Sequence, residues 1–564
     1  MACAIEADKL SVTYRGSSRP ALADVSVVAR AGTRICITGA DGAGKSTFCL
    51  CLNGVIPHIY RTDYSGRVLV HGRDPKTTPV HEMAALSGLV LQDFDAGLLT
   101  HSVEQELAFG LENLRVPRQE GLKRIEFYLD ILGLQKRRFD PPATLSGGQR
   151  QLLATAALLI MQLPVMIFDE ATSDLDPTMQ ARLRELIGRL RPQGSTELFV
   201  DQRTENALTA DEIWVFENGS ILRSGKPEDI LLDDDLLGRA CMRPPELPEL
   251  MHRLGFPKKL YRPAEALREI RTFAPSLLTF KSEPAADAGQ FRSPFMEMIA
   301  LGYSYTGHEA KALSDITLSI GRGESVAILG CNGSGKSTLA KVLSGIYAPS
   351  KGTVSIDGRP IQHYKRHELA QLVGYVYQNP DQQIFAATVS EEVSFGPRQL
   401  GFSRTECRSM VSDALTMLGL QGIDQRDPML LTKGERHRVC IASVLVTKPQ
   451  MLILDEPTKG LDYCHQLKLL DLLKRLNDIG HTIVIITHSI WVAAEYCSRV
   501  IVMRDGVIAG DGSTQQVLAH PSILEGAGLR STDLIGFSNL LGLGVVRMSE
   551  IESELRMRMA ARKA

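Results

Sequence analysis

The sequence lacks the paired cysteines of zinc-binding and dithiol redox motifs, and it lacks the strong positive net charge typical of nucleic-acid-binding proteins. Its ten cysteines include no Cys-x-x-Cys pair, so no zinc knuckle or dithiol redox motif is expected, and the thiols are predicted to stay reduced. The net charge is only −2 over 564 residues. So small a net charge gives no general indication of nucleic-acid binding.

Long hydrophobic runs are also absent. One apolar stretch, residues 152–168, is interrupted by Gln162 and Pro164 and falls short of the roughly 20 residues that cross a bilayer. It is better interpreted as a buried helix followed by a buried strand. The N-terminal residues contain no apolar core typical of a signal peptide. We therefore expect neither a signal peptide nor a membrane-spanning segment.

Two loops of the form Gly-x-x-x-x-Gly-Lys-Ser are the first positive feature. Residues 39–47 read GADGAGKST and residues 330–338 read GCNGSGKST. Their glycines let backbone N–H groups approach phosphate oxygens, and the helix that follows adds partial positive charge at its N-terminus. Lys45 and Lys336 are predicted to reach the β- and γ-phosphates of a nucleotide. The hydroxyls predicted to hold Mg²⁺ beside these phosphates are those of Ser46 and Ser337.

The two loops belong to an internal repeat. Gln92 matches Gln378 and Gln202 matches His488, each pair 286 residues apart, so the two copies are almost free of gaps between these points. Each copy alternates short apolar segments with helical ones, which predicts an α/β domain with a largely parallel core sheet.

The repeat divides the chain into four parts. We expect a first domain with a short helical tail, a Pro-rich linker, a second domain and a C-terminal helical tail. Their predicted bounds are 1–255, 256–293, 294–530 and 531–564.

Two further motifs complete each copy. LSGGQ at 145–149 is followed about twenty residues later by the apolar strand that ends in Asp169-Glu170, and ILDEPTKGLD occupies 453–462. Together with the P-loop and the glutamine, this order resembles the ATP-binding cassette (ABC) ATPases over both copies. The resemblance implies two P-loop nucleotide-binding domains, each with a mainly parallel core sheet, an antiparallel β subdomain and a helical subdomain. It also implies a head-to-tail pair in which each ATP lies between one P-loop and the other copy's LSGGQ.

The same resemblance assigns roles at matching positions. Glu170 and Glu456 would polarise the attacking water, because a carboxylate beside the γ-phosphate is what in-line attack requires. His488 would contact the γ-phosphate, and Gln202 takes its place in the first copy. Asp169, Asp455, Gln92 and Gln378 would complete the Mg²⁺ shell with the two serines. The remaining ATP contacts implied are Gly39, Ala40, Asp41, Gly42, Ala43, Gly44, Thr47, Gly330, Cys331, Asn332, Gly333, Ser334, Gly335, Thr338, Ser146, Gly147, Gly148, Gln149, Thr432 and Gly434, with Tyr14 and Tyr305 stacking on adenine.

A narrower resemblance follows the second glutamine. Residues 377–396, YQNPDQQIFAATVSEEVSFG, are similar to the ATPases of energy-coupling-factor (ECF) importers and their cobalt-type relatives. In that family this region meets a membrane-embedded scaffold subunit, and a separate membrane subunit binds the solute. The resemblance thus implies an ATPase that couples hydrolysis to vitamin or metal-ion uptake from the cytoplasmic face of the membrane. It implies no nucleic-acid partner.

The two nucleotide sites are not expected to be equal. Gln202 stands where a switch histidine is usual, and it can neither carry charge nor relay a proton near pH 7. The second copy reads Leu431-Thr-Lys-Gly-Glu435 in place of LSGGQ. There Lys433 adds a side chain where glycine is usual, and Glu435 brings a carboxylate near an anionic ligand. Under head-to-tail pairing, all three departures fall in the site of Lys45 and Glu170.

Two other functions remain open on the sequence. A soluble tandem ABC ATPase that acts on ribosomes or DNA would also lack membrane spans. However, residues 239–292 are only mildly basic and no zinc-binding cysteine cluster is visible in the sequence. An exporter ATPase is a third possibility that the NPDQQIF segment disfavours. The transported solute is not readable, because in such importers another subunit selects it.

Overall fold

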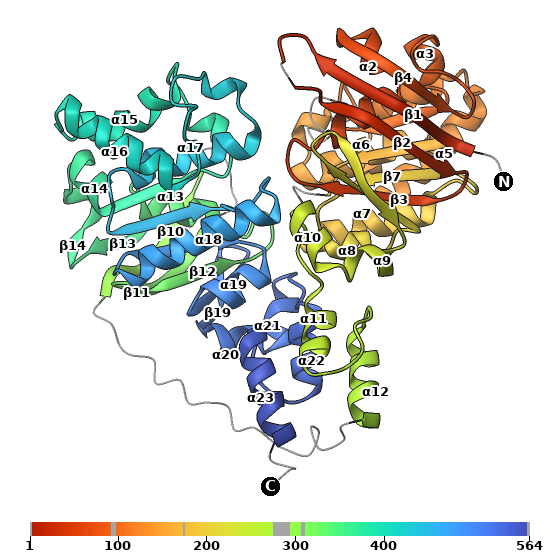
Figure 1. Cartoon of the computed structure of the whole chain (residues 1–564). Helices are drawn as coiled ribbons and strands as arrows, with labels where there is room; N and C mark the ends of the chain where they lie inside the picture. Colours follow the sequence, from red (N-terminus) through yellow and green to blue (C-terminus); the bar gives the residue numbers. More distant parts are fainter. Residues whose placement is uncertain are drawn as a thin grey trace. The chain divides into compact units, whose positions relative to one another are not determined.

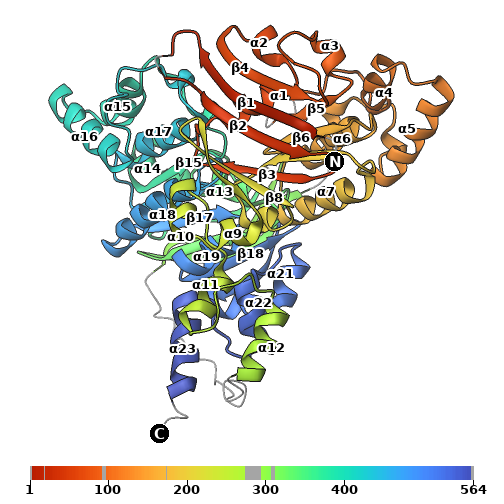
Figure 2. The same ribbon diagram turned by 45° about the vertical axis from the view of Figure 1, so that its right-hand side comes forward.

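The computed structural model describes residues 3–17, 19–91, 97–172, 175–273, 294–305 and 311–560. The chain forms two compact units, each described below by itself (Figures 1 and 2). The first unit comprises Met1–Leu175, Met179–Pro245 and Asp462–Cys464. The second comprises Asp176–Thr178, Glu246–Leu461 and His465–Ala564.

A six-stranded sheet forms the centre of the first unit. Its order is β5-β6-β7-β3-β8-β9, and all neighbouring strands are parallel except β8 and β9. The bounds are β3 (Arg34–Gly39), β5 (Ser87–Val90), β6 (Val165–Asp169), β7 (Thr196–Val200), β8 (Glu212–Glu217) and β9 (Ser220–Gly225). An antiparallel sheet of order β2-β1-β4 lies beside it, formed by β1 (Cys3–Tyr14), β2 (Leu22–Arg30) and β4 (Thr62–Val70).

Side chains of the central strands alternate between two hydrophobic cores. In β6, Val165 and Ile167 pack with the antiparallel sheet and helix α1 (Lys45–Leu52). Met166 and Phe168 point to the other face and pack with the helical layer. Both faces of the sheet are therefore covered, which is why these strands read as continuous apolar runs.

The helices of the first unit cover these two faces. Helix α4 packs against α5 and α6 (Figure 2), and these three form the helical subdomain. The bounds of the remaining helices are α2 (Val55–His58), α3 (Val80–Met83), α4 (Val103–Asn113), α5 (Arg118–Leu132), α6 (Gly147–Leu159), α7 (Pro177–Leu190), α8 (Thr204–Ala207), α9 (Pro227–Leu231) and α10 (Asp234–Ala240).

The second unit repeats this plan. Its central sheet has the order β15-β16-β17-β12-β18-β19, and its antiparallel sheet the order β11-β10-β13-β14. The central strands are β12 (Ser325–Leu329), β15 (Val373–Val376), β16 (Met451–Asp455), β17 (Thr482–Thr487), β18 (Arg499–Arg504) and β19 (Val507–Ser513). The other strands are β10 (Pro294–Ser304), β11 (Lys311–Gly321), β13 (Lys351–Ile356) and β14 (Arg359–Pro360).

Its helices also follow the first unit, with α15, α16 and α17 packed together as the helical subdomain (Figure 1). The helices that belong to the repeat are α13 (Lys336–Leu343), α14 (Arg366–Leu372), α15 (Val389–Gln399), α16 (Arg404–Met417), α17 (Lys433–Leu445), α18 (Tyr463–Asp478), α19 (Ile490–Tyr496), α20 (Thr514–Leu518) and α21 (Pro521–Gly526). A short 3₁₀ helix, η6 (Pro380–Gln382), precedes α15.

A separate hydrophobic cluster joins four further helices of the second unit. Helices α11 (Glu246–Arg253) and α12 (Pro263–Phe273) pack with α22 (Asp533–Leu540) and α23 (Met548–Ala560). Phe537 is completely buried at the centre of this cluster. Segments from the middle and the end of the chain thus share one core, and α12 lies in the stretch predicted from sequence to be a linker. The functional domain boundaries stay a prediction.

The α/β class predicted from the sequence is confirmed in both units. Each has a mainly parallel core sheet, an antiparallel sheet and a group of helices. Within the ranges described above, none of the helices combines the length and the apolar character needed to cross a membrane.

Candidate nucleotide-binding sites

Each predicted phosphate-binding loop connects a central strand to a helix. In the first unit β3 ends at Gly39 and α1 begins at Lys45. The Nζ of Lys45 donates hydrogen bonds to the carbonyl oxygens of Gly39 at 2.8 Å and Ala40 at 2.9 Å. The lysine therefore folds back over its own loop, and its ammonium group is held by the loop's first two carbonyl oxygens.

The second loop has the same geometry. Lys336 begins α13, and its Nζ donates to the carbonyl oxygens of Gly330 at 2.8 Å and Cys331 at 2.7 Å. Burial lowers the pKa of Lys336, while the nearby carboxylates of Glu456 and Asp455 act in the opposite direction. The ammonium group is thus held among partners that a phosphate could replace.

One glycine in each loop explains why the motif tolerates no larger residue there. Gly44 and Gly335 cap the helices at φ 99° and 100°, in the left-handed region that favours glycine. A Cβ at Gly44 would lie 2.4 Å from the carbonyl oxygen of Ala21, and at Gly335 2.7 Å from that of Ala312. The absence of this carbon lets the chain turn directly into a helix whose N–H groups point at the loop's interior.

The residues predicted to hold Mg²⁺ fit that role in both units. The Ser46 hydroxyl is hydrogen-bonded to Asp169, which ends β6, and Oδ1 of Asp169 is buried with no hydrogen-bond partner among the described residues. In the second unit, Asp455 is hydrogen-bonded to Ser337 and accepts from the Tyr375 hydroxyl at 3.1 Å. A hydroxyl beside a carboxylate oxygen is an all-oxygen donor set of the kind that Mg²⁺ prefers.

In the second unit, both carboxylate oxygens of the glutamate that follows β16 accept hydrogen bonds from neighbouring residues. Glu456 has a φ of 50°, a strained conformation for a residue other than glycine. Its Oε1 accepts from His488 Nδ1 at 2.8 Å and its Oε2 from the Thr487 hydroxyl at 3.2 Å. Burial raises the pKa of Glu456, but the charge and hydrogen bond of His488, followed by the charge of Lys336, hold it below its ordinary value. The site keeps this carboxylate ionised.

The matching glutamate of the first unit has a different environment. Glu170 has the same backbone conformation, with φ 49°. Burial raises its pKa to about 7; Lys45 opposes the shift, and the charges of Asp169, Asp41 and Asp201 add to it. Gln202, which stands in place of His488, donates instead to Oδ1 of Asp41 in the P-loop at 2.8 Å. At neutral pH this carboxyl group is therefore partly protonated.

A buried ion pair replaces the polar strand end seen in the second unit. Asp201 occupies the place of Thr487, and its Oδ2 lies 3.1 Å from Nη2 of Arg203. Burial raises the pKa of Asp201, but the charge and hydrogen bonds of Arg203 hold it below its ordinary value. Asn206 and Thr172 complete the network. The sequence analysis did not single out these residues, although FVDQR in place of IITHS was a visible signal.

The two signature segments are LSGGQ at residues 145–149 and its counterpart at residues 431–435. Each caps the N-terminus of a helix, but with different hydrogen bonds. Ser146 caps α6: its hydroxyl oxygen accepts from the Gln149 N–H at 3.3 Å, and the Gln149 side chain accepts from the Ser146 N–H at 3.1 Å. Thr432 caps α17 in the same way with Glu435. There the Thr432 hydroxyl also donates to Oε2 of Glu435 at 2.9 Å. The Thr432 hydroxyl group is thus engaged as a donor within its own cap, whereas the Ser146 hydroxyl group only accepts.

The remaining predicted residues have these positions. The hydroxyls of Tyr14 and Tyr305 lie 3.2 Å and 2.9 Å from those of Thr47 and Thr338 in the P-loop helices, so both rings lie beside their P-loops. Gln378 follows β15 and is exposed. Gln92 lies outside the described residues, as does the side chain of Lys433.

Other predicted contacts lie in the loops already described. Asp41, Gly42, Ala43, Asn332, Gly333 and Ser334 are part of the P-loops, and Gly147, Gly148 and Gly434 lie in the first turns of α6 and α17.

A strand, a glycine loop closed by Lys-Ser and a helix, with a carboxylate ending the neighbouring strand, define a P-loop nucleotide-binding protein, and the chain contains this arrangement twice. The family model for ABC transporters matches residues 22–173 and 313–459. The chain belongs to the ABC transporter family, as an ATP-binding, ATP-hydrolysing component. The predicted membership in the ABC ATPases is confirmed; the roles of single residues stay predictions.

Curated relatives match almost the whole chain. A putative ABC transporter ATP-binding protein of Caldanaerobacter subterraneus subsp. tengcongensis is 38% identical and covers 95% of both chains. One from Methanosarcina acetivorans is 36% identical, over 93% of this chain and 88% of its own. The tandem arrangement is thus shared by relatives from different organisms.

Two solved structures each match one cassette. The cbiO1 protein of Clostridium perfringens, described as part of the ABC transporter complex cbiONQ, is 37% identical over 42% of this chain and 95% of its own, with a TM-score of 0.37. A dimeric ATP-binding cassette bound to ADP and phosphate is 30% identical over 39% of this chain and 98% of its own, also with a TM-score of 0.37.

Proposed function

We propose that the chain is the motor subunit of an ECF-type importer, with its two cassettes forming a head-to-tail pair around two ATP molecules of unequal fate. One site, built on Lys336, Glu456 and His488, hydrolyses ATP at each cycle. The other, built on Lys45 and Glu170, mainly holds ATP and keeps the pair closed.

The contrast between the two glutamates carries this proposal. A general base must be deprotonated and positioned to accept a proton from the attacking water. Glu456 is held ionised by His488 and its oxygens are fixed by two hydrogen bonds. The pKa of Glu170 is raised to about 7, and Gln202 is bonded elsewhere. Only the second unit combines a charged base with a histidine that can donate toward the γ-phosphate.

Lys336 and the loop N–H groups would bind and orient the β- and γ-phosphates, because they are the hydrogen-bond donors of a phosphate-binding loop. Ser337 and Asp455 would hold Mg²⁺, which supplies charge neutralisation for the phosphates when bound. The Glu456 carboxylate then takes the proton of a water aligned for in-line attack, and His488 stabilises the charge that develops on the γ-phosphate oxygens.

The signature segments extend the inequality under head-to-tail pairing. The Ser146 hydroxyl accepts one hydrogen bond from the backbone, so its O–H group could donate to a phosphate oxygen. The Thr432 hydroxyl donates its hydrogen bond to the Glu435 carboxylate, whose negative charge would repel an anionic ligand bound there. Two like charges about 4 Å apart repel by roughly 4 kcal/mol at an effective dielectric constant of 20. The three departures from the family pattern, at Gln202, Lys433 and Glu435, therefore all belong to the site of Lys45.

Exposed apolar pairs at matching positions of the two units support a membrane partner. Phe385 and Phe395 are 65% and 45% exposed, and their ring centroids lie 4.8 Å apart. Leu99 and Phe109, their counterparts in the first unit, are 68% and 49% exposed. Apolar side chains that cluster on a surface often mark a contact site, because a partner that covers them removes their apolar area from water. We propose that each receives an apolar coupling helix of the membrane scaffold.

The backbone beneath the exposed pair is held firmly. Oε2 of Glu392 accepts from the N–H groups of Phe385 at 3.0 Å and Ala386 at 2.9 Å. Glu106 does the same for Leu99 and Thr100 in the first unit. A buried carboxylate that fixes an exposed loop is suited to a contact that must transmit force.

Co-purification tests the proposed partner. The tagged chain, expressed in its own cells and extracted in mild detergent, is expected to retain a polytopic scaffold protein and a second, small membrane protein whose identity names the solute. Co-purification with ribosomes or DNA in place of membrane proteins would contradict the importer assignment.

A further inference from the structure

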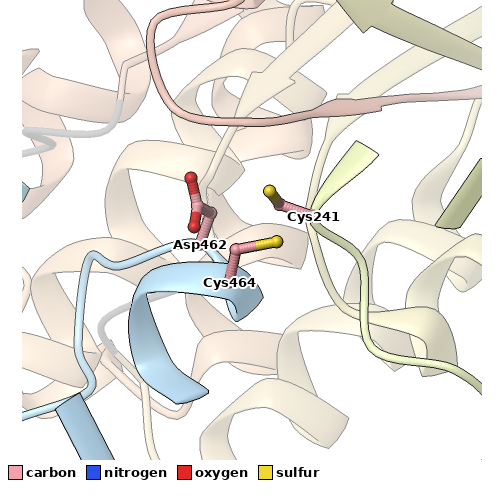
Figure 3. A group of neighbouring side chains, drawn as sticks. All are labelled: Cys241, Asp462 and Cys464. Carbon is pink, nitrogen blue, oxygen red and sulfur yellow. The ribbon is translucent and has the colours of Figure 1, made fainter. Parts of the chain in front are cut away.

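A cluster of metal-binding side chains lies outside both nucleotide sites. The thiols of Cys241 and Cys464 and a carboxylate oxygen of Asp462 all lie within 4.8 Å of one another (Figure 3). Cys241 follows helix α10, Asp462 directly precedes α18, and Cys464 lies in the first turn of α18. All three belong to the first compact unit.

Main-chain hydrogen bonds hold the backbone of Cys241 and the thiol of Cys464 in place. Cys241 ends α10 at φ 51°, with its N–H bonded to the carbonyl oxygens of Gly238 and Leu237. Its own carbonyl oxygen accepts from the Tyr463 N–H at 3.1 Å. The Cys464 thiol donates to the Gly238 carbonyl oxygen at 3.7 Å. Glycine is the usual residue in the left-handed position that ends a helix. Cys241 therefore places a thiol at a position where the backbone conformation favours a residue without a side chain.

This donor set selects one chemical class of ligand. Two thiols and one carboxylate match the sulfur and oxygen ligands of borderline-soft divalent ions such as Zn²⁺, whereas Mg²⁺ and Ca²⁺ prefer oxygen alone. Bonds of about 2.3 Å to sulfur and about 2.1 Å to oxygen in a tetrahedron require ligand atoms roughly 3.5 to 3.8 Å apart. The ligand atoms lie within 4.8 Å of one another, so binding requires them to approach by up to about 1 Å.

We propose that Cys241, Cys464 and Asp462 form a binding site for one divalent transition-metal ion of the Zn²⁺ class, with the fourth position open to water. Binding converts the two thiols to thiolates and releases two protons to solvent. Burial raises the pKa of Cys241 to about 12, with the neighbouring Cys464 and Asp462 adding to the shift. The metal therefore has to displace these protons.

The proposed site is directly connected to the first P-loop. Oδ2 of Asp462 accepts from the Asp41 N–H at 3.1 Å, and the Asp462 N–H donates to Oδ2 of Asp41 at 3.1 Å. A metal ion on the other oxygen of Asp462 would hold this reciprocal pair in place. We expect occupancy of the site to restrain the loop of residues 39–47.

Cobalt titration tests the site directly. The full chain, reduced with a phosphine and stripped of metal without oxygen, is titrated with Co²⁺, whose bonds to thiolate absorb in the near ultraviolet. We expect one Co²⁺ per chain with a thiolate band, displaced by Zn²⁺. The band should disappear in Cys241→Ser and in Cys464→Ser, affinity should fall roughly tenfold or more in Asp462→Asn, and the exposed Cys3→Ser control should bind normally.

Two measurements on the unaltered chain remove dependence on the folding of the variants. Zn²⁺ should protect Cys241 and Cys464, but not Cys3, from alkylation, and should slow amide hydrogen exchange in residues 39–47. Absence of the thiolate band, a band that persists in both serine variants, or equal alkylation with and without Zn²⁺ would overturn the site. Unchanged exchange in the P-loop would overturn its connection to residues 39–47.

Discussion

At the scale of single residues, the two glutamates show how neighbours set the chemistry of identical side chains. Glu170 and Glu456 share a strand end and a left-handed backbone conformation. His488 beside Glu456 lowers the pKa of that carboxyl group, while burial and the nearby carboxylates raise the pKa of Glu170 to about 7. The difference depends on the histidine at position 488 and on Asp41 and Asp201, two carboxylates near Glu170 whose counterparts in the second unit, Asn332 and Thr487, are neutral.

This difference predicts opposite effects of the same substitution on stability. Because the folded pKa of Glu170 is raised above 4.5 to about 7, the folded state binds more protons than the unfolded state in this window, and stability falls as pH rises. The folded pKa of Glu456 is lowered, so its contribution is present above pH 4.5 and is lost as pH falls through the folded pKa. At pH 8, Glu170→Gln should raise Tm by a few degrees and Glu456→Gln should lower it.

Thermal unfolding of the nucleotide-free chain between pH 5 and 8 measures both effects. The gap between Glu170→Gln and the unaltered chain should widen with pH up to about 7 and then stay constant. A change of the same sign in both variants at pH 8 would contradict the assigned electrostatics.

The signature of the second copy gives a prediction about a single hydrogen bond. Glu435→Gln should release the Thr432 hydroxyl proton, since an amide in the same place can cap the helix as Gln149 does. In a Glu456→Gln background, we expect ATP turnover to rise about tenfold, the equivalent of one hydrogen bond to a charged group of about 1.5 kcal/mol. Steady-state ATPase measurements test this, and unchanged turnover would show that Glu435 does not limit the site.

At the scale of elements, the exposed aromatic pair formed by Phe385 before α15 and Phe395 within it predicts a separation of binding from catalysis. Replacing Phe385 and Phe395 by serine should remove the proposed docking pair and leave the core intact, because both side chains are largely exposed. We expect ATPase activity of the isolated chain to stay unchanged and co-purification of the membrane scaffold to be lost. Val507→Ser, at another exposed apolar position, is the matched control. Retention of the scaffold by the double variant would contradict the docking surface.

The elements themselves were largely predictable from the sequence. Apolar runs such as 165–169 and 451–455 are strands buried on both faces. The same patterns occur in both copies of the repeat, which supports each assignment twice. The P-loop lysines and the serines beside Asp169 and Asp455 lie together as the motif implies. This succeeded because short-range spacing alone determines a strand, loop and helix.

Contacts between distant segments were not predictable in the same way. The packing of α11 and α12 with α22 and α23 joins segments almost 300 residues apart, for which periodicity gives no partner. The Asp201–Arg203 pair and the Thr432–Glu435 hydrogen bond depend on side-chain geometry. The cluster of Cys241 with Cys464 is not visible as a motif in the sequence, because the two cysteines lie 223 residues apart and only folding brings the thiols together.

At the scale of the whole molecule, unequal sites predict unequal effects of the two P-loop lysines. Lys336→Ala should reduce ATP turnover by about a hundredfold or more, because the hydrolytic site loses its phosphate ligand. Lys45→Ala should leave measurable turnover and mainly weaken closure of the paired cassettes, seen as a higher ATP concentration for half-maximal rate. Steady-state ATPase assays compare the two, and equal loss would contradict the division of roles.

The central claim is that one of two similar sites performs the hydrolysis. The most direct measurement is the ATPase rate of Glu456→Gln and Glu170→Gln, each purified with the same partners and saturated with Mg-ATP. We predict that Glu456→Gln loses turnover by about a hundredfold or more, whereas Glu170→Gln retains a substantial fraction of it. Equal loss in the two variants would contradict the account.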